Sequence, residues 1–189
     1  LEEIGIDHVE YAAIALPTPI SGDKILMVNS PWETFSIEET KQQLGLKNVV
    51  FLNDFHALAL AIPHLDEEHL VKVGGISGDP YKPRGIIGPG TGLGVASLIR
   101  HPNGEYLAVP AEGGHSSFTP VNIEEVELWE FVHKRFHHVS FERFVSGPGL
   151  QLIYEAVCNQ KRFQIEHMLS PAEITERALN QECWICQTT

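Results

Sequence analysis

Residues 49–62, Val-Val-Phe-Leu-Asn-Asp-Phe-His-Ala-Leu-Ala-Leu-Ala-Ile, decide the fold class. The first four residues are apolar and two of them are β-branched, which predicts a buried strand. The Ala- and Leu-rich residues 55–62 stop at Pro63, which predicts a helix. Asn53 and Asp54 therefore stand where a strand ends and a helix begins. In open α/β sheets this is the edge at which ligands bind.

Two roles are open for Asp54. Its carboxylate could act as a general base on a substrate hydroxyl. It could instead cap the helix that follows, because Asp is a favoured N-cap residue. The apolar run before it and the neighbouring Asn53 favour a functional site.

The residues before this stretch also alternate between strand and helix patterns. Residues 10–16 and 24–29 are strand-like, and the Pro- and Gly-rich connection between them indicates a hairpin. Ser36 and Glu39 have the spacing of a capping box, which predicts a helix that Gly45 closes. The mixture predicts an α/β protein.

A second decisive stretch is residues 85–99, in which two apolar segments flank Gly88-Pro-Gly-Thr-Gly-Leu-Gly94. It reads as a strand, a glycine turn and another strand. The alternating glycines allow positive φ and close backbone approach, and successive amides can form an anion-binding nest. The stretch matches neither the P-loop nor the dinucleotide fingerprint. We predict a phosphate-binding hairpin with Thr91 adding a hydroxyl; a tight hairpin without a ligand is the alternative.

Two further motifs offer carboxylates. Glu112-Gly-Gly-His115 pairs a carboxylate with an imidazole, which suits binding of neighbouring hydroxyls, although a simple polar turn is the alternative. No other His or Cys stands at ligand spacing, so no metal site is predicted there. Glu142 precedes Ser146-Gly-Pro-Gly at a predicted helix start, where it could also serve only to stabilise the helix dipole. Further helices are predicted from residues 123, 150 and 170 onward.

Composition excludes several classes of protein. The chain has 189 residues, with 13 Lys and Arg against 25 Asp and Glu and a formal charge of −12, so it lacks the basic field that binds nucleic acid. No apolar run approaches the roughly 18–20 residues that span a membrane. The 3 cysteines are too few for a disulfide scaffold and indicate reduced thiols, and Cys183-Trp-Ile-Cys186 is a weak motif because no second pair accompanies it.

Several motifs, in their order and spacing, resemble the bacterial glucokinase family of hexokinase-like sugar kinases. The matching segments are residues 52–55, 88–95, 110–115, 139–150 and 174–179. The resemblance implies an α/β, two-lobed, actin-like or ribonuclease-H-like sugar kinase fold. It also implies ATP-dependent phosphorylation of glucose at the 6-hydroxyl to glucose 6-phosphate, with Mg²⁺, in the cytoplasm and at the start of glycolysis. The family often has Pro-Gly-Glu-Gly-Gly-His where this chain has Ala111 after Pro110, a mild departure that removes neither Glu112 nor His115.

The resemblance also assigns residues. It makes Asp54 the acceptor of the proton from the 6-hydroxyl, and it places the phosphates of the nucleotide at the Gly-Thr-Gly turn of Gly90, Thr91 and Gly92. The residues that it assigns to sugar binding are Asn53, Glu112, His115 and Glu142.

The same resemblance predicts the organisation of the chain. We expect residues 1–64 to belong to a small lobe and residues 65–189 to a large lobe. The family's opening Asp-x-Gly-Gly-Thr loop and closing glycine-rich adenosine segment are not in this sequence. We therefore expect a fold truncated at both ends that does not phosphorylate glucose by itself. The expected partners are glucose and ATP, and both a monomer and a homodimer stay open.

Two alternatives to a glucokinase stay open from the sequence. One is a non-catalytic sugar-binding regulator of the same superfamily. The other is a different carbohydrate or acyl kinase on the actin-like fold. The combination of Asn53-Asp54 with Glu112 and His115 favours an unmodified hexose as the substrate.

Overall fold

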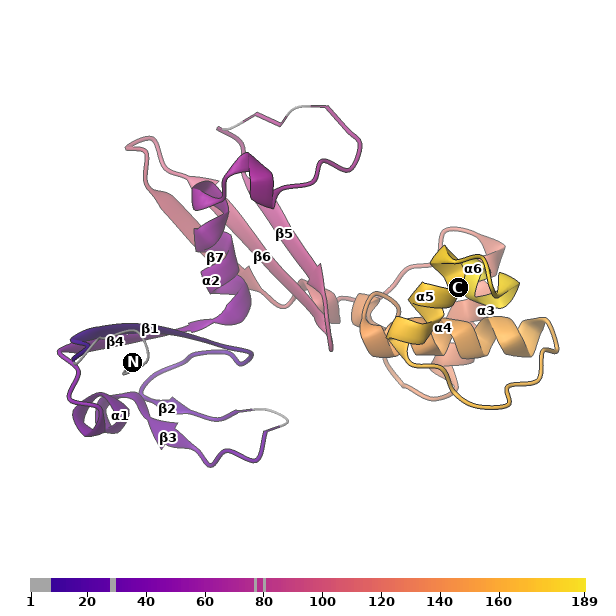
Figure 1. Ribbon diagram of the computed structural model, residues 1–189, viewed down its shortest axis with the longest axis horizontal. Coiled ribbons are helices and arrows are strands. Elements are labelled where there is room, and N and C mark those ends of the chain that lie inside the picture. Colours follow the sequence, from indigo (N-terminus) through magenta and orange to yellow (C-terminus); the bar gives the residue numbers. More distant parts are fainter. Residues whose placement is uncertain (1–7, 28–29, 77, 80) are drawn as a thin grey trace. The chain divides into compact units, whose positions relative to one another are not determined.

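The computed structural model describes residues 8–27, 30–76, 78–79 and 81–189, which form a mixed α/β fold (Figure 1). The chain divides into two compact units, one of residues 1–85 and 96–110 and the other of residues 86–95 and 111–189. Each unit is described separately below. The division into a small lobe of residues 1–64 and a large lobe of residues 65–189 stays a prediction.

In the first unit, a parallel strand pair carries the stretch that decides the fold. Strand β1 (Tyr11–Leu16) pairs with β4 (Asn48–Asn53) in a register that places Leu16 opposite Asn53. Strand β2 (Lys24–Ile25) pairs antiparallel with β3 (Phe35–Ser36). The predicted hairpin between residues 10–16 and 24–29 is therefore wrong for the described residues, and positions 28–29 lie outside them.

The physical reason is a shared apolar core. Leu16, Ile25, Val49 and Phe51 bury their side chains together, so the parallel pair of β1 and β4 covers a cluster that a local hairpin would leave without Val49 and Phe51. Thr18, also buried, donates from its hydroxyl to the Leu26 carbonyl over 2.9 Å.

The predicted helices of this unit are present. Helix α1 (Ile37–Gln43) is capped by Ser36, whose hydroxyl accepts from the Glu39 amide over 3.1 Å. A carboxylate from further away completes the cap, because Asp23 Oδ1 accepts from the Glu38 amide over 3.0 Å. Gly45, at φ 64°, follows the helix as predicted.

Helix α2 (Asp54–Ala61) begins directly after β4, as the sequence predicts. Two short 3₁₀ turns follow, η2 (Ile62–His64) and η3 (Glu67–His69). Pro63 lies inside η2, so the α-helix stops just before the residue that has no amide to donate.

A three-stranded sheet with strand order β5-β6-β7 contains the glycine stretch. Its strands are β5 (Arg84–Pro89), β6 (Leu93–Arg100) and β7 (Tyr106–Ala111). The boundary between the two units runs through these strands. The predicted sequence of strand, glycine turn and strand is confirmed, and Gly104 at φ 94° makes the second turn.

The second unit is mostly helical. Val132, Val139, Phe144 and Leu152 form one buried cluster, and a second surrounds Leu169, Ile174 and Ile185. The helices are α3 (Ile123–His133), α4 (Gly147–Gln160), α5 (Pro171–Leu179) and α6 (Trp184–Thr188), and the 3₁₀ turns are η4 (Gly113–His115) and η5 (Phe141–Arg143). The predicted helices are confirmed, whereas α6 was not foreseen because it is only five residues long.

The cysteines belong to the second cluster. Cys158 and Cys186 are buried beside Tyr154, and Cys183 is half-buried at its edge. Burial raises the pKa of Cys186 to about 11, and with the hydrogen bond to Cys158 it raises the pKa of Tyr154 to about 12. These groups therefore stay neutral at pH 7 and pack as core side chains. Over the described ranges, no helix is both long and apolar enough to cross a membrane.

Candidate active site

The junction between β4 and α2 positions Asn53 and Asp54, both half-buried. Asn53 is the N-cap of α2, because its Oδ1 accepts from the amides of Phe55 over 3.0 Å and His56 over 3.2 Å. Asp54 is the first residue of the helix. The sequence left open whether Asp54 was the cap, and the structure gives that role to Asn53.

Asn53 also orients the carboxylate beside it. Its Nδ2 donates to Asp54 Oδ1 over 3.0 Å, and the Phe55 amide donates to the same oxygen over 2.9 Å. Both hydrogen bonds described for this carboxylate are accepted by Oδ1. Oδ2 is therefore the oxygen that remains available to a ligand. A carboxylate held at one oxygen and available at the other can accept a proton from a bound hydroxyl.

Glu112 is the N-cap of the one-turn 3₁₀ helix η4 in the second unit, and His115 is the last residue of that helix. His115 Nδ1 lies 3.1 Å from Glu112 Oε2, and the side chains are 64% and 71% exposed. The backbone closes the same turn, because the His115 amide donates to the Glu112 carbonyl over 3.0 Å. The two side chains are therefore in contact, which fits both the predicted hydroxyl-binding pair and its alternative, a polar turn.

Glu142 approaches His115 from the other side. It lies on η5, is 25% exposed, and places Oε1 3.9 Å from His115 Nε2. Its other oxygen, Oε2, accepts from the backbone amide of Leu93 over 3.0 Å. Each ring nitrogen of His115 therefore faces a carboxylate oxygen. The three side chains offer a compact set of hydrogen-bonding edges suited to a polyhydroxylated ligand.

The backbone around Glu142 is held on both sides. The Ser146 hydroxyl donates to the Glu142 carbonyl over 2.7 Å and accepts from the Gly149 amide over 3.0 Å, which caps α4. The Phe141 amide donates to the Ser116 carbonyl over 3.0 Å, which joins η5 to the segment after η4. The sequence places Ser146 at a predicted helix start, and the structure makes it the N-cap of α4.

Glycines in these motifs provide space. A Cβ at Gly114 would collide with the carbonyl of Leu93, and one at Gly113 would lie 3.1 Å from Val95 Cγ1. The Gly-Gly dipeptide therefore lets η4 pack directly on the start of β6. Close approach, which the sequence predicted as one use of glycine, is the use that the structure makes of it here.

The backbone of the glycine turn differs from the prediction of positive φ angles. Gly90 and Gly92 are not among the described glycines with positive φ, which are 22, 45, 74, 75 and 104. The Gly90 amide donates to the Gly92 carbonyl over 2.8 Å, and the Gly90 carbonyl accepts from the Gly147 amide at the start of α4 over 2.8 Å. Because the amides of Gly90 and Leu93 are already engaged, the donors that the turn can offer an anion are the Thr91 and Gly92 amides and the Thr91 hydroxyl.

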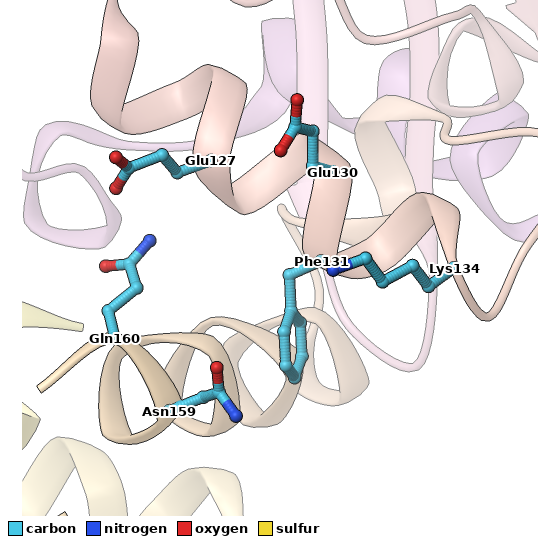
Figure 2. Close-up of a pocket in the computed structure, with 6 residues that line it drawn as sticks. All are labelled: Glu127, Glu130, Phe131, Lys134, Asn159 and Gln160. Carbon is cyan, nitrogen blue, oxygen red and sulfur yellow. The ribbon is translucent and has the colours of Figure 1, made fainter. Parts of the chain in front are cut away.

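A polar hollow in the second unit is separate from these motifs. It lies between α3 and α4 and has a volume of ≈ 290 Å³. Figure 2 shows the side chains of Glu127 and Gln160 facing one another across it. It is lined by Glu127, Glu130, Phe131, Lys134, Asn159 and Gln160, and none of these is a predicted site residue.

The side chains of Asp66, Glu68 and His69 lie close enough together to hold a metal ion. They are exposed, they belong to η3 and its N-cap in the first unit, and none of them is a predicted site residue.

The structure thus brings Glu112, His115, Glu142 and the glycine turn together within the second unit, and builds Asn53 and Asp54 into the first unit. The contribution of Leu93 was not predicted. It acts through its backbone amide, which carries no signal in the residue type.

Comparison with known structures assigns the class of the fold. It is a sugar kinase fold, similar to the crystal structure of a glucokinase from an Antarctic psychrotroph, with a TM-score of 0.78 and 32% identity over 93% of this chain and 54% of that one. The fold is also similar to that of the Balamuthia mandrillaris glucokinase solved with glucose, with a TM-score of 0.77, 22% identity, and coverage of 93% of this chain and 55% of that one.

The chain belongs to the glucokinase family, whose family model, "Glucokinase", matches residues 1–189. It is 46% identical to the glucokinase of Helicobacter pylori over 187 residues, which are 96% of this chain and 55% of that protein. It is 44% identical to the glucokinase of Neisseria gonorrhoeae, with 99% of this chain and 56% of that protein covered. The chain spans about half the length of the curated relatives it matches.

Proposed function

We propose that this chain carries the residues with which a glucokinase transfers the γ-phosphoryl group of ATP to the 6-hydroxyl of glucose. The observation that supports this most strongly is that Asn53, and not Asp54, is the N-cap of α2. The side chain of Asn53 and the Phe55 amide both donate to Asp54 Oδ1, which leaves Oδ2 as the oxygen available to a bound hydroxyl. Membership of the glucokinase family supplies the reaction.

In the proposed reaction, Asp54 accepts the proton of the 6-hydroxyl as the bond from its oxygen to phosphorus forms. The proton passes to the carboxylate, and the bond between the γ-phosphorus and the bridging oxygen breaks to release ADP. A sugar hydroxyl is a weak nucleophile, and phosphoryl transfer depends mainly on positioning and charge stabilisation. A carboxylate within hydrogen-bond reach would orient the hydroxyl and take its proton.

Glu112, His115 and Glu142 are proposed to bind the sugar hydroxyls, together with Asn53. Support for this comes from the contacts of His115, which lies 3.1 Å from Glu112 and 3.9 Å from Glu142. Such a cluster offers several donors and acceptors in fixed relative positions, so it can orient one face of a sugar ring.

The turn of Gly90, Thr91 and Gly92 is proposed to bind the nucleotide phosphates. The amides of Thr91 and Gly92 and the hydroxyl of Thr91 fit this role, since an anion needs N–H and O–H donors that the backbone has not already used. Bound together with the nucleotide, Mg²⁺ would supply positive charge that neutralises the phosphates. A cytoplasmic location and the two-lobe division stay proposals of the same kind.

The test is a coupled assay of glucose-dependent ADP formation by the full-length protein, together with calorimetric titration of glucose. We expect ADP formation that requires both glucose and Mg²⁺ and that Asp54→Asn abolishes. Glucose binding without any ADP formation would instead support the non-catalytic sugar-binding regulator. Absence of both would overturn the proposed function.

A further inference from the structure

The glycine turn and the carboxylate of Glu142 are in direct contact, although 49 positions of the chain separate the two hydrogen-bonded residues. Oε2 of Glu142 accepts from the Leu93 amide over 3.0 Å. This bond joins the first residue of β6 to η5, two elements that are otherwise built from separate motifs.

The absence of a side chain at position 92 makes this contact possible. The three atoms nearest to a Cβ added at Gly92 all belong to Glu142, and its Oε2 would overlap the new carbon. Gly92 has no positive φ that would require glycine for backbone reasons. The carboxylate of Glu142 therefore occupies the space that a side chain at position 92 would fill.

We propose that Gly92 is a positioning residue for the sugar site: it leaves the space in which the Leu93 amide fixes Glu142. This inference rests on the proposed function for the sugar-binding role of Glu142. Holding Oε2 on the amide directs Oε1 toward His115 Nε2, 3.9 Å away. One turn thus serves both substrates, since Thr91 and Gly92 offer donors to phosphate while Gly92 and Leu93 fix a sugar-contacting carboxylate.

The arrangement has a consequence for pairs of substitutions. An added methyl group at position 92 displaces the carboxylate of Glu142 and breaks its bond to Leu93. In Glu142→Asp the side chain is one methylene shorter and already withdrawn from that space, so the same methyl group meets nothing there. The two substitutions should therefore not add, as expected for residues in direct contact.

The experiment begins without sugar, with the chain labelled with ¹⁵N-leucine. An amide that donates to a carboxylate has a downfield proton resonance, so we expect the Leu93 proton to move upfield in Glu142→Gln and in Gly92→Ala. Gly85→Ala is the matched control, because an added Cβ there has nothing within 4 Å and Gly85 lies in neither site motif. A Leu93 resonance unchanged in Glu142→Gln overturns the inference even if Gly92→Ala does not fold.

The second readout is glucose affinity by calorimetry. We expect Gly92→Ala to weaken glucose binding about tenfold or more, as for loss of a hydrogen bond to a charged group. We expect the double variant with Glu142→Asp to bind no more weakly than Glu142→Asp alone. Full additivity would overturn the positioning role. Failure of the wild-type protein to bind glucose would count against the proposed function, and the Leu93 resonance would still decide the inference.

Discussion

The two halves of the proposed active site are constructed in opposite ways. Asn53 and Asp54 are neighbours in sequence, and the described hydrogen bonds of their side chains reach no further than Phe55 and His56. The cluster of Glu112, His115 and Glu142 is assembled from distant segments that glycines allow to pack closely. We infer that the first half depends on one strand-to-helix junction, whereas the second depends on the packing of several elements.

This difference suits the two halves to different functional roles. A junction with its own cap can hold a single reactive carboxylate in place, as a proton acceptor requires. A cluster that joins three segments can present several groups to one ligand, as sugar recognition requires. Substitution of Asp54 should therefore affect mainly the rate, and substitutions in the second half should affect mainly binding and stability.

The largest expected effect is that of Asp54→Asn on turnover by the full-length protein. The amide cannot accept the proton of the hydroxyl, so we expect kcat to fall by about 10²–10⁴-fold, the usual contribution of a general base. Steady-state kinetics with saturating ATP and glucose measure it. Asp66→Asn, at an exposed acidic residue of the same unit, is the matched control. A kcat for Asp54→Asn within a few-fold of wild type would remove Asp54 from the chemistry.

Gly114→Ala should have the next largest effect, and it tests the packing of the second half. The new Cβ would meet the Leu93 carbonyl, which is backbone and cannot swing away. We expect the free energy of unfolding to fall by about 1–3 kcal/mol, as for overpacking at a tight contact. Urea denaturation measures this, with Gly85→Ala as the control in open space. Equal stability of the two variants would show that η4 does not need its close approach to β6.

Asn53→Ala should have the smallest effect on stability, and it separates capping from sugar binding. Loss of the cap of α2 should lower the free energy of unfolding by about 1 kcal/mol. Asn122 caps α3 in the same manner, accepting from the Glu125 amide over 2.8 Å, so Asn122→Ala is the matched control. Both variants should lose similar stability, but only Asn53→Ala should weaken glucose binding. Equal glucose affinity in the two would leave Asn53 with a capping role alone.

Much of the fold was predictable because its signals are local. The strand and helix around Asn53 follow from an apolar run and a terminating proline. Helix α5 begins at the start predicted near residue 170, where Ser170 and Glu173 form a capping box. The pairing of β1 with β4 was missed, since the partner strand lies beyond α1 in sequence and the choice depends on a shared core.

The candidate site shows the same limit. The residue types of Glu112, His115 and Glu142 indicated hydroxyl binding, and the family resemblance assigned them to sugar. Their mutual contacts could not be predicted, because they depend on how β6, η4 and η5 pack. The bond from Leu93 to Glu142 involves a backbone amide, and the role of Gly92 is visible only once the carboxylate beside it is placed.

The central claim is that Asp54 serves the chemical step and Glu142 serves sugar binding, and calorimetric titration of glucose into Asp54→Asn and Glu142→Gln tests it most directly. We predict that Asp54→Asn binds glucose with nearly wild-type affinity, whereas Glu142→Gln binds it about tenfold or more weakly. The reverse pattern, with affinity lost in Asp54→Asn and retained in Glu142→Gln, would contradict the division.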